Sequence, residues 1–220
     1  MPYFYGRAEG GSVSIEGADA RHLARSLRAR PGELIQVIDP ERSVLMSVRL
    51  GTVSPELVGG LVEAERAHRP EPEVEVTMAL AMLPASALDD ALARCTELGA
   101  HGFLLVDAER SVARGARPER WATICREASL LAGRLRVPEV RGPVPLAEAL
   151  AACRRPLLLD RDGEIRLSPV RDAATLFIGP EGGWTDAERV LAPARVSLGP
   201  RNLRAENAAA AALAVALSGA

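Results

Sequence analysis

The segment Thr175–Ala208 reads TLFIGPEGGWTDAERVLAPARVSLGPRNLRAENA and is predicted to decide the fold. Two short runs, 175–178 and 195–198, each end in Gly-Pro, which predicts two buried strands closed by sharp turns. Thr185 and Glu188 have the spacing of a capping box, so we expect a short helix to begin there. Because ligands of open α/β sheets sit where loops leave the carboxyl ends of strands, the two turns predict a binding cleft built largely from backbone.

Strand and helix signals alternate over the C-terminal two thirds of the chain. Alternating apolar residues predict a strand over 74–83, and Ser86 is expected to cap a helix that ends at Gly99. Pro118 is expected to open a second helix with Leu131 on its buried side. Such alternation is typical of an α/β fold with a mostly parallel sheet and flanking helices. Further strands are expected at 103–106 and 157–159.

The N-terminal part is different, because residues 1–65 carry short β-rich runs and a single helix signal at 18–29. The polar segment 67–72 contains two prolines and shows no periodicity, so we expect a linker there. The chain is therefore expected to form two domains, 1–68 and 73–220. The strands of the first domain are expected at 12–15, 34–38, 44–50 and 57–63.

Composition limits the classes of function. The 220 residues carry a net charge of −2 and are 48% hydrophobic, which suits a globular chain with a buried core. All 27 cationic residues are arginine, so a lysine-bearing phosphate loop and a catalytic lysine are excluded. The three cysteines lie too far apart in sequence for a metal site, and no metal is expected. No apolar run reaches the length of a membrane span, so we expect a cytoplasmic protein without a membrane partner.

Arginines are concentrated in two stretches. In the helix expected over 18–29, Arg21, Arg25 and Arg28 recur at i, i+4 and i+7 on one side. The segment 110–136 contains seven arginines but only two acids. Both stretches are suited to contact RNA phosphates, although on the residues alone a solvated helix face is the favoured interpretation of the first.

The last helix is expected to begin near Ala205 and is rich in alanine, the best helix former. Its alanines at 208, 209, 211 and 212 would leave one face with only methyl groups, which permits close approach of another backbone. The partner of this face is either the protein's own sheet or a second copy of the chain.

The motifs IGPEGGWTDAE (178–188) and LGPRNLRAEN (198–207) resemble the C-terminal signature of the SPOUT methyltransferases. With upstream motifs such as Glu109-Arg-Ser-Val112 and Gly133-Arg134, the chain most resembles the ribosomal RNA small subunit methyltransferase E family over nearly its whole length. The resemblance implies a trefoil-knotted SPOUT domain and a PUA-like N-terminal β-barrel that binds RNA. It also implies a homodimer that methylates N3 of a uridine in 16S ribosomal RNA of the small subunit.

The resemblance implies site residues as well. RNA would be contacted by Arg21, Arg25, Arg28, Arg110 and Arg134. Uridine N3 carries a proton, so methylation requires a base or a cation that stabilises the anion. The candidates are Arg134, Arg204 and Glu206, with Arg201 as a further one; a structural ion pair is an equally good interpretation of each. Three loops would gather the cofactor S-adenosylmethionine through Leu159, Ile178, Gly179, Pro180, Glu181, Gly182, Leu198, Gly199 and Leu203.

The chain departs from the family pattern at three places, which keeps other functions open. Leu83-Pro-Ala-Ser86 lacks a basic residue, Leu131-Ala132 replaces Gln-Ser, and Asn207 stands where threonine is common. A diverged RNA-binding relative without catalytic turnover is therefore one alternative. Another is a nucleotide-binding enzyme that uses the Gly-Pro loops for phosphate, although proline has no N–H to offer an anion.

Overall fold

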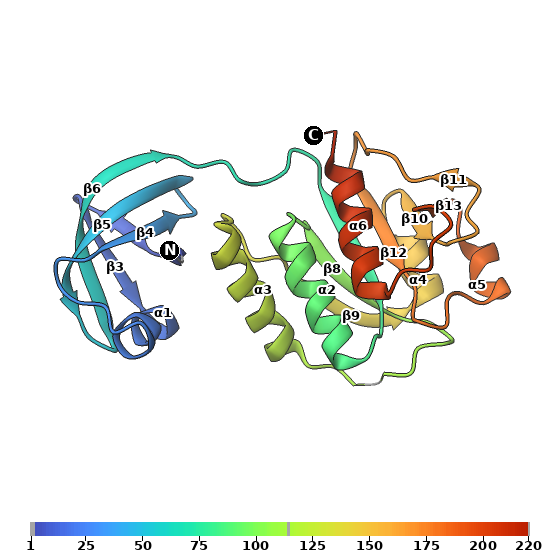
Figure 1. The fold of residues 1–220 in the computed structure, drawn as a ribbon, viewed down its shortest axis with the longest axis horizontal. Helices are drawn as coiled ribbons and strands as arrows, with labels where there is room; N and C mark the ends of the chain where they lie inside the picture. Colours follow the sequence, from blue (N-terminus) through green and yellow to red (C-terminus); the bar gives the residue numbers. More distant parts are fainter. Residues whose placement is uncertain (1–2, 114, 220) are drawn as a thin grey trace. The chain divides into compact units, whose positions relative to one another are not determined.

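The computed structural model of the chain describes residues 3–113 and 115–219 (Figure 1). The chain divides into two compact units, residues 1–71 with 129–136, and residues 72–128 with 137–220. The sequence predicts that 129–136 belongs to the second domain, whereas the structure groups this segment with the first unit. Arg134 explains the difference, because its buried guanidinium is paired with Glu71 at 2.6 Å.

The first unit is built on a six-stranded sheet in the order β1-β4-β5-β6-β3-β2. Strands β1 and β4 are parallel, and the other neighbours are antiparallel. The register of β5 and β6 shifts beside Gly59 and Gly60, where a Cβ on Gly60 would lie 2.4 Å from the Arg49 carbonyl oxygen. Glycine is therefore required at this bulge. The strands are β1 Tyr3–Tyr5, β2 Arg7–Glu9, β3 Ser12–Glu16, β4 Leu34–Asp39, β5 Val44–Val53 and β6 Leu57–Ala67.

The helix expected over 18–29 is shorter and less regular than the periodicity predicts. An α-helix, α1 (Gly17–Arg21), continues directly as a π-helix, η1 (His22–Ser26). Arg28 lies beyond both and has a φ of +53°, so the expected i, i+4, i+7 row of arginines is wrong at its third member. Leu27, the C-cap of η1, is exposed.

The second unit contains a seven-stranded sheet in the order β11-β13-β10-β12-β7-β8-β9. Every pair of neighbouring strands in it is parallel, which confirms the prediction of a mostly parallel sheet. Its central strands are buried on both faces, as expected for a parallel sheet covered by helices. The strands are β7 Val76–Ala81, β8 Gly102–Asp107, β9 Val140–Pro145, β10 Pro156–Leu159, β11 Ile165–Arg166, β12 Ala174–Ile178 and β13 Arg195–Ser197.

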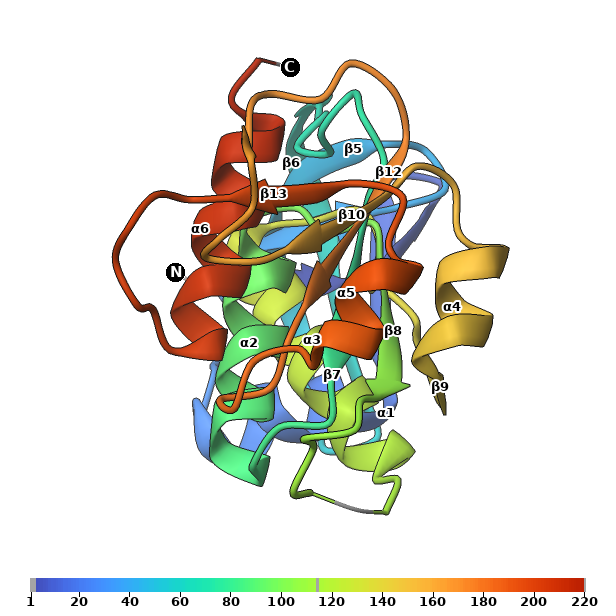
Figure 2. The ribbon, with the colours of Figure 1, turned by 90° about the vertical axis from the view of Figure 1, so that its right-hand side faces the viewer.

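Helices cover both faces of this sheet. Figure 2 shows α2 and α6 on one side of the strands and α4 and α5 on the other. Pro84, and not Ser86, occupies the N-cap of α2, and Leu131 is 66% exposed near the end of α3, so these two expectations are wrong. Among the described residues, no helix is both long enough and apolar enough to cross a membrane. The helices are α2 Ala85–Glu97, α3 Pro118–Ala132, α4 Leu146–Ala152, α5 Asp186–Leu191 and α6 Ala205–Leu217.

Candidate active site

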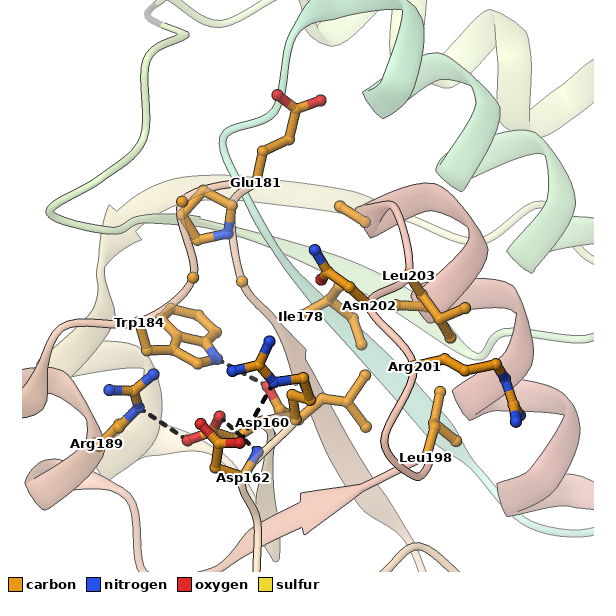
Figure 3. A pocket seen from close by; sticks show the side chains of 18 of the residues that line it. Asp160, Asp162, Ile178, Glu181, Trp184, Arg189, Leu198, Arg201, Asn202 and Leu203 are labelled. Atoms are coloured by element: carbon orange, nitrogen blue, oxygen red, sulfur yellow. Dashed lines mark hydrogen bonds and ion pairs between the residues drawn. The ribbon is translucent and has the colours of Figure 1, made fainter.

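Three loops enclose a cavity of about 280 Å³ at the carboxyl ends of β10, β12 and β13 (Figure 3). These strands are parallel neighbours, so their ends meet at one edge of the sheet. All nine residues that the family resemblance implies for the cofactor line this cavity; their role in binding a cofactor stays a prediction. They are Leu159, Ile178, Gly179, Pro180, Glu181, Gly182, Leu198, Gly199 and Leu203.

Trp184 joins two of these loops. Its indole is buried, and its Nε1 donates a hydrogen bond to the Leu159 carbonyl oxygen at 2.9 Å. A Cβ added to Gly179 would lie 2.9 Å from Cε2 of this indole, so the ring occupies the space that a side chain at 179 would need. The first Gly-Pro turn therefore needs glycine for close packing.

A buried carboxylate organises the other wall. Asp160, which is 6% exposed, receives hydrogen bonds from Arg189 Nε at 2.9 Å and from the Asp162 backbone N–H at 3.2 Å. Burial lowers the pKa of Arg189, but its hydrogen bond to Asp186 and the charge of Asp160 outweigh burial and raise it. Arg189 therefore stays protonated, and the pair links the loop after β10 to helix α5.

Helix α5 begins with the predicted capping box. The Thr185 side chain accepts the Glu188 N–H at 3.3 Å, and the Glu188 carboxylate accepts the Thr185 N–H at 2.8 Å. Glu188 is buried, and its other carboxylate oxygen accepts the Glu109 N–H at 2.8 Å. The start of α5 is therefore stabilised by its own capping box and by a hydrogen bond from the loop that follows β8.

Comparisons with known proteins agree with one another. The family model of the RNA methyltransferase domain matches residues 70–217. Ribosomal RNA small subunit methyltransferase E of Synechocystis sp. is 33% identical over 92% of this chain and 72% of its own length. The protein of the same name from Bacillus subtilis is 29% identical over 91% of this chain and 87% of its own length. The chain belongs to the ribosomal RNA small subunit methyltransferase E family.

A solved member of this family has the same fold. The crystal structure of ribosomal RNA small subunit methyltransferase E from Neisseria gonorrhoeae, bound to S-adenosyl methionine, superposes with a TM-score of 0.86 and is 29% identical. The alignment covers 97% of this chain and 95% of that one, so the likeness includes both units.

Several cavity residues of this family member were not predicted. Asp160, Asp162, Trp184, Arg189 and Asn202 line the cavity together with the expected residues. A usable signal existed for Asp160, since a carboxylate directly after a buried parallel strand lies at the ligand edge of the sheet. No signal marked Trp184, because its contact with Gly179 depends on how the loop closes.

The catalytic candidates lie in different surroundings. Glu206 is in the first turn of α6 and only 9% exposed, and among the described residues its carboxylate forms no hydrogen bond or ion pair. Arg204 is the exposed N-cap of α6, and Arg201 lines the cavity with its guanidinium pointing away from Asp160 in Figure 3. Arg134 is 2% exposed and paired with Glu71, so its predicted contacts with uridine and RNA have no support in this geometry.

The arginines expected at RNA also differ from one another. Arg21, Arg25 and Arg28 are exposed and form no ion pair with a described residue. In the 110–136 segment, Arg120 is paired with Asp89, and Arg136 with Glu71, so the free positive charge is smaller than composition indicates. Arg110 binds the Gly182 carbonyl oxygen at 2.8 Å, and Arg114 lies outside the described residues.

The alanine face of α6 is already covered by the chain itself. Ala208, Ala209 and Ala212 belong to the core of the second unit, and Ala212 is 0% exposed. Of the two partners left open for this face, the structure therefore shows the protein's own core at these three alanines. The opposite side, which includes Asn207 and Ala214, is exposed.

Two of the departures from the family pattern, Leu83 and Asn207, have structural roles. Leu83 is buried in the core, whereas Leu131 is exposed near the end of α3 and the structure assigns it no role. Asn207 accepts a hydrogen bond from Arg94 Nη1 at 2.7 Å, which joins α6 to α2. The described residues contain no group of three or more His, Cys, Asp or Glu side chains that could hold a metal ion.

Proposed function

We propose that the chain is an S-adenosylmethionine-dependent enzyme that methylates N3 of a uridine in 16S ribosomal RNA of the small subunit. One observation carries the proposal: three loops at adjacent parallel strand ends enclose a cavity lined by glycine backbone and by all nine expected residues. Membership of the family and the S-adenosyl methionine bound to the Neisseria gonorrhoeae relative support it.

The cavity suits this cofactor better than a phosphate ligand. Leu159, Ile178 and Leu198 offer apolar surface to a purine, and the glycines leave backbone N–H and C=O groups accessible. The lining carboxylates of Asp160, Asp162 and Glu181 are matched by three arginines, 161, 189 and 201, so the cavity has no excess of positive charge to hold a phosphate. The rival function as a phosphate-loop enzyme is therefore disfavoured.

Side chains of the protein would remove the N3 proton of the uridine and stabilise the resulting negative charge. When bound, S-adenosylmethionine supplies an electrophilic methyl group on a sulfonium. The Glu206 carboxylate, nearly buried and without a partner among the described residues, can accept the N3 proton. Arg204, at the positive end of α6, can stabilise the negative charge that develops on the base.

We further propose that the second unit is a SPOUT-type trefoil knot and that the first is a PUA-like RNA-binding barrel. The order of strands supports the knot, because β13 lies between β10 and β11, which precede it in the chain. The exposed Arg21 and Arg25 support RNA contact by the first unit. A homodimer would use the exposed side of α6 near Ala214, and a ribosomal substrate would place the enzyme in the cytoplasm.

The proposal is tested in two steps. Calorimetry should show S-adenosylmethionine binding to the full chain, and absence of binding would contradict the proposal. Small ribosomal subunits that lack the modification are then incubated with protein and cofactor, and nucleosides from digested RNA are separated by mass. N3-methyluridine is expected; binding of cofactor and RNA without this product would support the diverged, non-catalytic alternative.

A further inference from the structure

Arg110 lies in the loop after β8, and its side chain holds the loop between β12 and α5. Its Nη1 donates to the Gly182 carbonyl oxygen at 2.8 Å, and Gly182 lines the cavity. A Cβ added to Gly182 would lie 3.4 Å from both Cβ and Cδ of Arg110. The aliphatic part of the Arg110 side chain therefore packs against the backbone of the loop at Gly182, which has no side chain of its own.

The neighbouring residue provides a second attachment. The Glu109 N–H donates to the Glu188 carboxylate, which also completes the capping box of α5. Residues 109 and 110 thus hold both the middle of the 179–184 loop and the start of the helix that follows it. A displacement of residues 109 and 110 would therefore move the 179–184 loop, which forms one wall of the cavity.

The Arg110 guanidinium has N–H groups that its hydrogen bond to Gly182 does not use. A guanidinium carries five N–H groups in a planar fork, and Arg110 uses one of them on Gly182. The side chain is exposed and forms no ion pair with a described residue. The free edge of the fork matches the geometry of a phosphate, so one guanidinium can hold Gly182 and an RNA phosphate together.

We propose that Arg110 is a positioning residue that couples RNA binding to cofactor binding. A backbone phosphate on its free N–H groups fixes the side chain over Gly182 and thereby orders the cavity wall. This inference rests on the proposed function, since it requires the cofactor in the cavity and RNA at Arg110. Because linkage is reciprocal, RNA tightens cofactor binding by the same factor by which the cofactor tightens RNA binding.

Calorimetry on the full chain tests this coupling. The probe is S-adenosylhomocysteine, which carries no methyl group to transfer, titrated with and without small ribosomal subunits that lack the modification. For the parent we expect tighter binding of the probe when subunits are present. In Arg110→Ala we expect affinity without subunits to fall about three- to tenfold, and the enhancement by subunits to disappear.

Arg171→Ala is the matched control. Arg171 is exposed, lies outside the arginine-rich segment 110–136 and forms no side-chain hydrogen bond or ion pair with a described residue. Its removal should leave both the affinity for the probe and the enhancement at the parent values. Arg110→Lys, which keeps the charge but lacks the planar fork, should retain RNA binding and lose most of the enhancement.

The outcomes separate this inference from the proposed function. Equal affinity and equal enhancement in the parent and Arg110→Ala would overturn the inference and leave the proposed function standing. Loss of enhancement in Arg171→Ala as well would also overturn it, because the enhancement would then depend on overall positive charge and not on Arg110. No binding of the probe or of S-adenosylmethionine to the parent would instead count against the proposed function. Thermal melting checks that the variants fold.

Discussion

The two Gly-Pro turns of the cavity carry the same dipeptide, yet they need glycine for different reasons. Gly179 does not have a positive φ, and it is restricted because the Trp184 indole fills the space beside its Cα. Gly199 has a φ of +106°, a conformation that L side chains rarely adopt, and its nearest neighbours are the mobile end atoms of Arg166 at 3.3 Å or more. The first turn is limited by packing and the second by backbone conformation.

This difference matters for how the cavity is stabilised. The turn at Gly179 is attached to the core through Trp184, which also binds the carbonyl of Leu159. The turn at Gly199 is followed by exposed residues, 201–204, before α6 begins. Changes at the first turn should therefore reach the fold, whereas changes at the second should act locally.

The largest effect is expected when the packing at the first turn is removed. Trp184→Ala deletes a buried indole and its hydrogen bond, and should lower the free energy of unfolding by about 3–5 kcal/mol. Chemical denaturation measures this change. Val190→Ala, which truncates an exposed side chain of α5, is the control and should stay within about 0.5 kcal/mol of the parent. Similar losses in both variants would show that Trp184 does not hold the turn.

The next largest loss of stability is expected from overpacking at the same turn. Gly179→Ala places a methyl group against the indole and should cost about 1–3 kcal/mol. In a Trp184→Phe background, where the ring is smaller, the same substitution should cost less. A double-mutant cycle measures the difference between the two costs. A cost that is equal in both backgrounds would mean that backbone conformation, and not the indole, restricts Gly179.

The second turn should respond to conformation alone. Gly199→Ala forces a side chain into a positive φ and should cost about 1–2 kcal/mol. An Arg166→Ala background should not reduce this cost, because the neighbouring guanidinium can move away from an added methyl group. Denaturation of the single and double variants checks this expectation. Relief by Arg166→Ala would remove the contrast between the two turns.

The two turns also show what the sequence can predict. The strands that end in Gly-Pro and the capping box at Thr185 follow from local signals, and a cleft beside them follows from the rule that parallel strand ends share an edge. The nine cavity residues are instead implied by the resemblance to the family. The packing of Trp184 on Gly179 could not be predicted, because it brings together two residues of one irregular loop. The conformation of such a loop leaves no periodic pattern in the sequence. Two other features also depend on more than the local sequence. The position of Arg28 depends on the continuation of α1 as a π-helix, and the burial of Ala212 depends on the elements that pack against α6.

The smallest effect near neutral pH concerns a residue remote from both turns. Burial raises the pKa of the Cys95 thiol from 9.0 to about 12. A raised pKa in the folded state contributes stability that is complete below the unfolded value and is lost as pH rises toward the folded value. Stability should therefore not depend on this thiol at pH 8 or below, and at pH 10 its titration in the unfolded chain should remove about 1.4 kcal/mol.

Denaturation of the parent and of Cys95→Ala at pH 8 and pH 10 isolates this contribution, since other titrating groups are common to both proteins. The parent should lose more stability between the two pH values than the variant does. Gly199→Ala should show the same pH difference as the parent, because a local strain at the second turn leaves the core around Cys95 closed. A parent and a Cys95→Ala variant with identical pH dependence would mean that the thiol is accessible in the folded protein. A smaller difference in Gly199→Ala would show that the second turn, like the first, acts on the core.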